Sequence, residues 1–137
     1  MTENQIGAVI VDSAIRIHQA LSPGLLESVY ETVLEHDLTK RGLTVQRQVA
    51  IPITFEGHHF DEGFRADLVV NNSVIIELKS VEKIHPSHMK QVLTYLKLTG
   101  MRLGFLLNFR EALMKTGIVR VVNGLPDEPK KETLCHG

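Results

Sequence analysis

Apolar residues in the N-terminal part of the chain recur at the spacing of α-helices. In the first run they are Ile6, Ile10, Ala14, Ile17 and Leu21, and in the second they are Leu26, Val29, Tyr30, Val33, Leu34 and Leu38. Because residues three and four positions apart share one helix face, the first run predicts a helix over roughly residues 4–20. Ser22-Pro23-Gly24 separates it from a second predicted helix, which is expected to end at Gly42.

Beyond this point the pattern becomes that of extended segments divided by turns. The predicted strands are 43–55, 58–70, 74–79, 103–107 and 118–122. The turns are expected at Glu56-Gly57 and at Asn71-Asn72-Ser73. Pro86 suits the first turn of a third helix, which is expected to run to Thr99.

The order of the predicted elements is helix, helix, three strands, helix, strand, strand. This order indicates an α/β protein with a central mixed β-sheet flanked by helices. Residues 1–125 are expected to form one domain, and the residues 126–137 that follow are interpreted as a polar C-terminal tail. Neither a signal peptide nor a membrane-spanning stretch is indicated, so a cytoplasmic location without membrane contact is expected.

Two neighbouring predicted strands each carry one wholly apolar face. The apolar sets are Ala66, Leu68 and Val70 in one strand and Val74, Ile76 and Leu78 in the other. Because side chains alternate between faces, matching these sets places Asp67 and Glu77 together on the opposite face. A three-residue loop at 71–73 sets the two carboxylates directly across from each other, whereas a two-residue turn would separate them.

Like charges at such a position repel, because directly opposed Cβ atoms lie about 5 Å apart. One acid is then protonated, or a neighbour such as Arg65 screens the pair, or a divalent cation lies between them. Lys79 follows on the same face, roughly 6–7 Å beyond Glu77. Two carboxylates and one lysine suit Mg²⁺-assisted hydrolysis of a phosphodiester, in which the lysine stabilises charge or orients the nucleophile.

Charge is distributed unevenly, although the net charge is only −1. Residues 1–78 hold 5 basic and 11 acidic side chains, while residues 79–120 hold 8 basic and 2 acidic ones. The basic part, which includes Lys83, Lys90 and Lys97, is suited to lie along a phosphate backbone. The competing interpretation is a solvated helix face with scattered surface charge.

Several segments resemble the PD-(D/E)xK nuclease superfamily and, within it, the GxxExxY protein family. The matching segments are Gly24 to Tyr30 (GLLESVY), Arg47-Gln48-Val49, Gly63 to Asp67 (GFRAD), Val74 to Lys79 (VIIELK), Gln91 to Leu96 (QVLTYL) and Gly104 to Phe109 (GFLLNF). The similarity extends over residues 5–125. Ala66 stands where the superfamily pattern has proline, a position that carries no chemistry.

The resemblance implies a restriction-endonuclease-like core, a Mg²⁺ cofactor that Mn²⁺ can replace, and nucleic acid as partner. It implies Glu27, Asp67, Glu77 and Leu78 as metal ligands, Asp67, Glu77, Lys79 and Gln91 as catalytic residues, and Tyr95 as a substrate-binding residue. The basic part of the chain adds Lys83 and Lys90 as candidate substrate-binding residues. The alternative for Glu27 is a solvated helix residue, and that for Tyr95 is a core aromatic. A homodimer or a partner subunit stays open.

Two functions remain at this point, beside a third possibility that the chain is a subunit that needs a partner for substrate binding. The first is a nuclease that hydrolyses DNA or RNA with metal-activated water. The second is a catalytically silent module that keeps the fold and binds nucleic acid or protein. The presence of Asp67, Glu77 and Lys79 together favours the nuclease, because a degenerate copy is expected to lose at least one of them.

Overall fold

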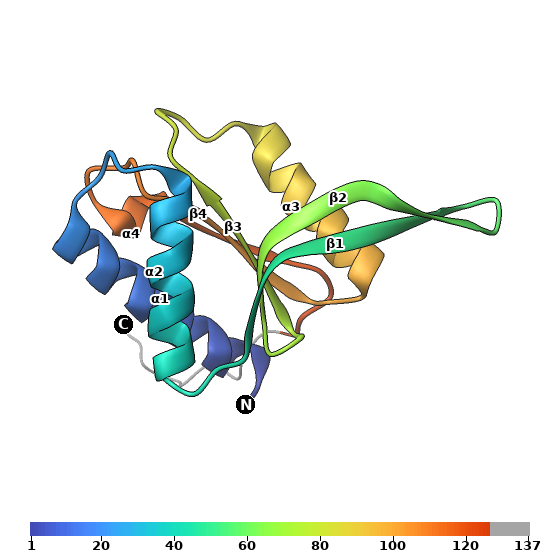
Figure 1. The fold of residues 1–137 in the computed structure, drawn as a ribbon, viewed down its shortest axis with the longest axis horizontal. Coiled ribbons are helices and arrows are strands. Elements are labelled where there is room, and N and C mark those ends of the chain that lie inside the picture. Colours follow the sequence, from blue (N-terminus) through green and yellow to red (C-terminus); the bar gives the residue numbers. More distant parts are fainter. Residues whose placement is uncertain (127–137) are drawn as a thin grey trace.

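The structure, a computed structural model, describes residues 1–126. Its elements are α1 (Glu3–Leu21), α2 (Glu27–Lys40), β1 (Val45–Phe55), β2 (His58–Val70), β3 (Val74–Lys79), α3 (Pro86–Thr99), β4 (Leu103–Asn108), α4 (Met114–Gly117) and β5 (Ile118–Val122). The strands form a five-stranded sheet in the order β1-β2-β3-β4-β5. Strands β3 and β4 are parallel and the other neighbours are antiparallel. The predicted α/β architecture with a mixed sheet is confirmed (Figure 1).

The helix ends follow from local chemistry. Thr2 and Gln5 form a capping box that starts α1, with the Gln5 amide donating to the Thr2 hydroxyl at 3.1 Å. Gly100 takes a left-handed conformation at the end of α3, a conformation that costs glycine little. The bounds of α3 are those predicted, whereas the four-residue α4 was not predicted, because it is too short to show a helical period.

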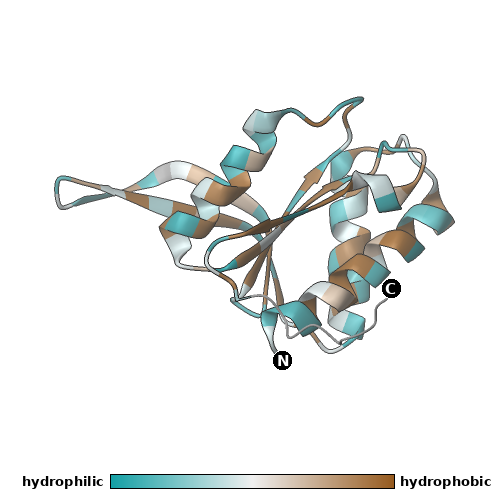
Figure 2. Ribbon diagram, turned by 180° about the vertical axis from the view of Figure 1, so that it is seen from behind, coloured by the Kyte–Doolittle hydropathy of each residue, from teal (hydrophilic) through white to brown (hydrophobic). Residues whose placement is uncertain are grey.

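Helices cover both faces of the sheet. Helices α1 and α2 pack on one face, around Leu68, Val70 and Ile76, and α3 packs on the other, around Ile75 and Leu106 (Figure 1). Figure 2 shows hydrophobic stretches running along the central strands between these two layers. The face of β3 that carries Glu77 lies beneath α3, so the carboxylate of Glu77 is in the interior.

The turn between β2 and β3 has the predicted length. Val70 pairs with Val74, so three residues connect the strands, and Asn71 and Asn72 have φ values of 52° and 50°. Asparagine accepts this left-handed conformation more readily than most residues. The register continues with Val69 opposite Ile75. Extended by two positions, it sets Asp67 directly across from Glu77, as predicted from the three-residue loop.

Strands β1 and β2 continue past the sheet as a two-stranded hairpin (Figure 1). Strand β2 has 13 residues but pairs with β3 only over residues 68–70. The outer part, residues 52–63, is named the arm here. Its tip is the predicted turn at Glu56 and Gly57, whose φ values are 50° and 80°.

The tail predicted at 126–137 lies outside the described residues from position 127 onward and stays a prediction. Between residues 1 and 126, no helix is both long enough and apolar enough to span a membrane.

Candidate active site

The candidate site lies where β2 and β3 separate. The pairing of β2 with β3 starts at the turn and ends at Leu68 and Ile76. Asp67 and Glu77 are the next residues beyond this last pair. Beyond it, side chains accept the main-chain hydrogen bonds: the Asp67 amide donates to Glu77 Oε2 at 2.7 Å, and the Leu78 amide donates to Asp67 Oδ2 at 2.8 Å. Each carboxylate therefore accepts a hydrogen bond from the main chain of the opposite strand with one oxygen. The other oxygen of each carboxylate is left for a different partner.

Burial makes this acid pair costly to ionise. Glu77 is only 4% exposed, and burial, followed by the nearby charge of Asp67, raises the pKa of its carboxyl to about 8. Burial is also the largest cause that raises the pKa of Asp67. The pair therefore holds a proton at neutral pH unless a cation lies beside it.

The charge of Lys79 acts on both acids. Lys79 ends β3, and its ammonium lowers the pKa of Asp67 and of Glu77, although less than burial raises them. In the parallel register Lys79 lies opposite Asn108. The side chain of Asn108 fixes the chain after β3, because it accepts from the Val81 amide at 3.1 Å and donates to the Val81 carbonyl at 2.8 Å.

Glu31 and Gln48, neither of which was predicted as a site residue, join the acid pair to α2. The Gln48 side-chain amide donates to Glu31 Oε1 at 2.9 Å and to Asp67 Oδ1 at 3.4 Å. The Arg47 guanidinium donates to Glu31 Oε2 at 3.0 Å. Glu31 is 7% exposed, and its charge contributes to raising the pKa of Asp67.

A signal for Glu31 is present in the sequence. Glu31 stands three and seven positions before Leu34 and Leu38, so it lies on the apolar face of the second helix. An acid on such a face needs a buried partner. Gln48 is marked out only by the structure, where it has a φ of 52° inside a strand. This conformation is uncommon for residues other than glycine.

Glu27 has a different neighbour from Glu31. Its carboxylate is exposed and accepts from the Ser80 amide at 3.1 Å, and the Ser80 hydroxyl donates to the Leu25 carbonyl at 3.2 Å. The buried Tyr30 hydroxyl donates to the Ser22 carbonyl at 2.6 Å and accepts from the Leu25 amide at 3.1 Å. These contacts fasten the turn before α2 to the end of β3, and the predicted role of Glu27 as a metal ligand stays a prediction.

The predicted residues on α3, and Lys83 just before it, divide between the interior and the surface. Tyr95 is buried, with its ring 5.1 Å from that of Phe64, and burial, with Glu77 next, raises the pKa of its hydroxyl to about 12. Gln91 lies half-buried one turn before Tyr95. Lys83 and Lys90 are exposed. The structure therefore brings Asp67, Glu77, Lys79 and Tyr95 together and leaves the other two lysines at the rim.

His88, also in α3, lies near the same end of the sheet. The pKa of its imidazole is lowered by burial first and then by the charges of Lys79 and His85, while Glu27 raises it. Its Nδ1 accepts from the His85 amide at 3.1 Å, which begins the helix. His88 was not singled out from the sequence as a site residue.

Comparison with known proteins decides the family. A family model described as the PD-(D/E)XK nuclease superfamily matches residues 4–121. The chain belongs to this superfamily. The matched range contains Asp67, Glu77 and Lys79, and the restriction-endonuclease-like fold class is confirmed. No curated protein and no solved structure matched the chain.

The donor set available in this PD-(D/E)XK chain is small. Within residues 1–126, no three histidine, cysteine, aspartate or glutamate side chains gather closely enough to hold a metal ion. Asp67 and Glu77 are two carboxylates in direct register on neighbouring strands, and the Leu78 carbonyl is a main-chain oxygen directly after Glu77. Mg²⁺ is commonly bound by one or two carboxylates and otherwise by water, so these residues fit it.

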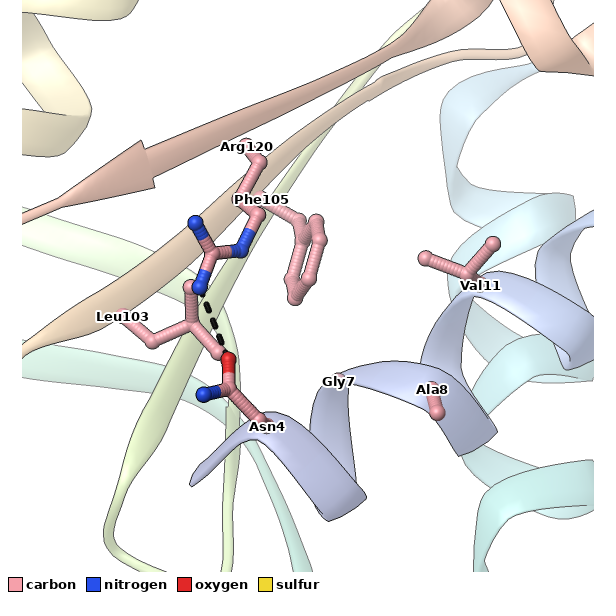
Figure 3. Close-up of a pocket in the computed structure, with 7 residues that line it drawn as sticks. All are labelled: Asn4, Gly7, Ala8, Val11, Leu103, Phe105 and Arg120. Atoms are coloured by element: carbon pink, nitrogen blue, oxygen red, sulfur yellow. Dashed lines mark hydrogen bonds between the residues drawn. The ribbon is translucent and has the colours of Figure 1, made fainter. Parts of the chain in front are cut away.

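One hollow of this PD-(D/E)XK fold lies away from the site. It is bounded by the start of α1 and the start of β4, with Gly7, Phe105 and Arg120 among its lining residues (Figure 3). The Arg120 guanidinium donates to Asn4 Oδ1 at 2.7 Å across it. Because β3 and β4 are parallel, this hollow is at the opposite end of the sheet from Lys79.

Proposed function

We propose that this chain is a Mg²⁺-dependent nuclease that hydrolyses phosphodiester bonds of DNA or RNA, with Mn²⁺ able to replace Mg²⁺. The observation that carries the proposal is the buried pair of Asp67 and Glu77 with raised pKa values beside Lys79. Membership of a nuclease superfamily supports the reaction class. The GLLESVY segment further supports assignment to the GxxExxY family.

The residues present suit a divalent cation electrostatically. Asp67 and Glu77 repel each other in the interior, and a cation between them offsets both this repulsion and the loss of hydration. The Leu78 carbonyl is the proposed third protein ligand, with Glu27 as an outer acid. When bound, the ion would polarise the phosphate and lower the pKa of a water molecule.

The chain's own groups have distinct proposed roles. The Lys79 ammonium would stabilise the negative charge that develops on the phosphate oxygens. Tyr95, whose pKa of about 12 keeps its hydroxyl protonated at neutral pH, would donate a hydrogen bond to the substrate, and Gln91 would help orient it. Gln48, held by Glu31, is a positioning residue, because it acts through Asp67.

A catalytically silent binding module is the second candidate. It is favoured by the main-chain hydrogen bonds that each acid accepts from the opposite strand, since these support the pair without a cation. In that case Asp67 and Glu77 would serve the strand junction alone. The basic surface of residues 79–120 would then bind its partner without cleavage.

A nuclease assay distinguishes the two candidates. Single- and double-stranded DNA and RNA are incubated with the protein in Mg²⁺, in Mn²⁺ and in EDTA. Cleavage is expected with either metal and not with EDTA. Asp67→Asn and Lys79→Ala should each lower the rate by about a hundredfold or more, while Lys40→Ala, on an exposed residue of α2, should leave it unchanged. An Asp67→Asn protein that cuts at the wild-type rate contradicts the assignment.

Binding of nucleic acid is tested separately with Lys83 and Lys90. If these exposed lysines contact phosphates, the logarithm of the affinity falls linearly with the logarithm of the salt concentration. Each lysine changed to glutamine should then reduce that slope by somewhat less than one. An affinity that does not depend on salt identifies the lysines as ordinary surface charge.

A further inference from the structure

The arm carries an apolar stripe that nothing in the described chain covers at its tip. Ile53 is paired with Phe60, and Phe55 is paired with His58. Because paired residues of antiparallel strands point to the same side, these four side chains share one face. Phe55 is 64% exposed and Phe60 is 46% exposed. Two large aromatic side chains this exposed on one face are typical of an interaction surface rather than of scattered surface residues.

The base of the arm is already covered by α3. Ile51, two positions before Ile53, is 2% exposed and packs with Tyr95 and Leu96 of α3. Helix α3 lies beside the base of the arm (Figure 1). The covering ends there: the register of β1 and β2 shifts between Ile51 and Ile53, and beyond this shift the stripe ends as bare surface at Phe55.

The charges of the arm limit what can cover it. Residues 48–64 contain no lysine or arginine but hold the acids Glu56, Asp61 and Glu62. A phosphate backbone is therefore repelled. A second arm laid face to face is disfavoured for the same reason, because acids would meet acids.

A surface of the opposite sign is present on the same chain. Residues 83–110 contain no aspartate or glutamate. On the C-terminal half of α3, Thr94, Lys97 and Leu98 are exposed, with Leu98 41% exposed. They lie three and four positions apart, on one face of the helix. This face joins a positive charge to an apolar side chain, which complements the acidic, aromatic arm.

We propose that the arm of one copy docks on the C-terminal half of α3 of a second copy, and that the second arm docks in the same way on the first. Such a reciprocal contact is a closed two-fold dimer, the commonest form of homo-oligomer. Each arm tip then reaches the base of the other copy's arm, where α3 lies. Lys83 and Lys90 remain available for substrate, and the proposal does not depend on nuclease activity.

The first test is the oligomeric state of the full chain, measured by sedimentation velocity over a concentration series. The wild type is expected to pass from monomer to dimer with rising concentration. Phe55→Ser combined with Phe60→Ser should weaken the dimer by about tenfold or more, because each partner loses apolar contacts. Leu113→Ser, which removes another side chain that is 66% exposed, is the matched control and should leave the dimer unchanged.

The second test exchanges the charges. Glu56→Lys combined with Asp61→Lys in one protein, and Lys97→Glu in another, should each weaken the self-dimer about tenfold. Mixing the two proteins should restore it, since the reversed arm then meets the reversed helix and the two native surfaces meet each other. Thermal melts confirm that each variant is folded. A wild type that stays monomeric, a dimer indifferent to the aromatic change, or a mixture that does not reassociate overturns the proposal.

Discussion

Neutralising Glu77 should stabilise this protein, against the usual expectation for a buried residue. The pKa of Glu77 is about 8 when folded, compared with 4.5 as its ordinary value, and burial is the main cause. The folded state therefore holds a proton that the unfolded state releases between these values. From pH 4.5 upward this lowers the free energy of unfolding, and at pH 7 the cost reaches about 3 kcal/mol. Glu77→Gln removes the cost and keeps an oxygen that can accept from the Asp67 amide.

The assay is a series of thermal or urea melts from pH 4 to pH 9 in EDTA. The stability difference between Glu77→Gln and wild type should be near zero at pH 4, grow with pH and level off above pH 8. At pH 7 the gain corresponds to a rise in melting temperature of up to roughly 10 °C for a domain of this size. Glu82→Gln, which makes the same chemical change on an exposed side chain, is the matched control and should show little gain at any pH.

Mg²⁺ should remove most of the stability difference between wild type and Glu77→Gln at pH 7. A ligand that binds only the folded state adds RT ln(1 + [L]/Kd), about 2.7 kcal/mol at a hundredfold excess over Kd. Wild type should gain this stability and Glu77→Gln should not. A stability difference that is the same at pH 5 and pH 8 refutes the raised pKa, and equal responses of both proteins to Mg²⁺ refute the two-carboxylate site.

Four further substitutions, at three positions, test the surroundings of the site. Tyr30→Phe removes the hydroxyl that donates to the Ser22 carbonyl and should cost about 1–3 kcal/mol in urea melts; an unchanged midpoint would contradict its role in the turn. Gly104→Ala should lower the free energy of unfolding by about 1–3 kcal/mol, because the added Cβ would lie 2.8 Å from the Val92 Cγ1 atom. An unchanged free energy of unfolding would mean that α3 shifts to make room for the methyl group. Gln48→Gly should be more stable than Gln48→Ala by about 1 kcal/mol, since glycine accepts the positive φ, while both should slow cleavage equally if the side chain positions the acid pair.

Periodicity predicted most of the fold because its elements are long and bounded by unambiguous residues. Pro86 and Gly100 fix both ends of α3, and the predicted bounds of β3 and β5 are those observed. The odd number of residues in the loop at 71–73 was also enough to place Asp67 beside Glu77. These features depend on contacts within a short stretch of chain, which a single sequence shows directly.

What the sequence could not supply depends on contacts between distant segments. The burial of Glu77 arises because α3 covers the face of the sheet that carries it, and the pattern along the strands does not show which face a distant helix covers. The bridge from Glu31 through Gln48 joins α2 to β1 and β2, and no local pattern specifies its partners. The two strands of the arm were predicted, but their extension beyond the sheet was not. The extension arises because only a few residues of β2 pair with β3.

The acid pair is anchored in the part of the molecule that should be the last to open. Strands β3 and β4 are buried along almost their whole length and lie at the centre of the sheet, with layers of helix on both sides. Their amides are expected to exchange with deuterium only through global unfolding, whereas those of the arm should exchange through local opening. Heating should therefore leave the geometry of Glu77 intact until the whole domain melts, so that thermal inactivation and loss of structure coincide in a single transition.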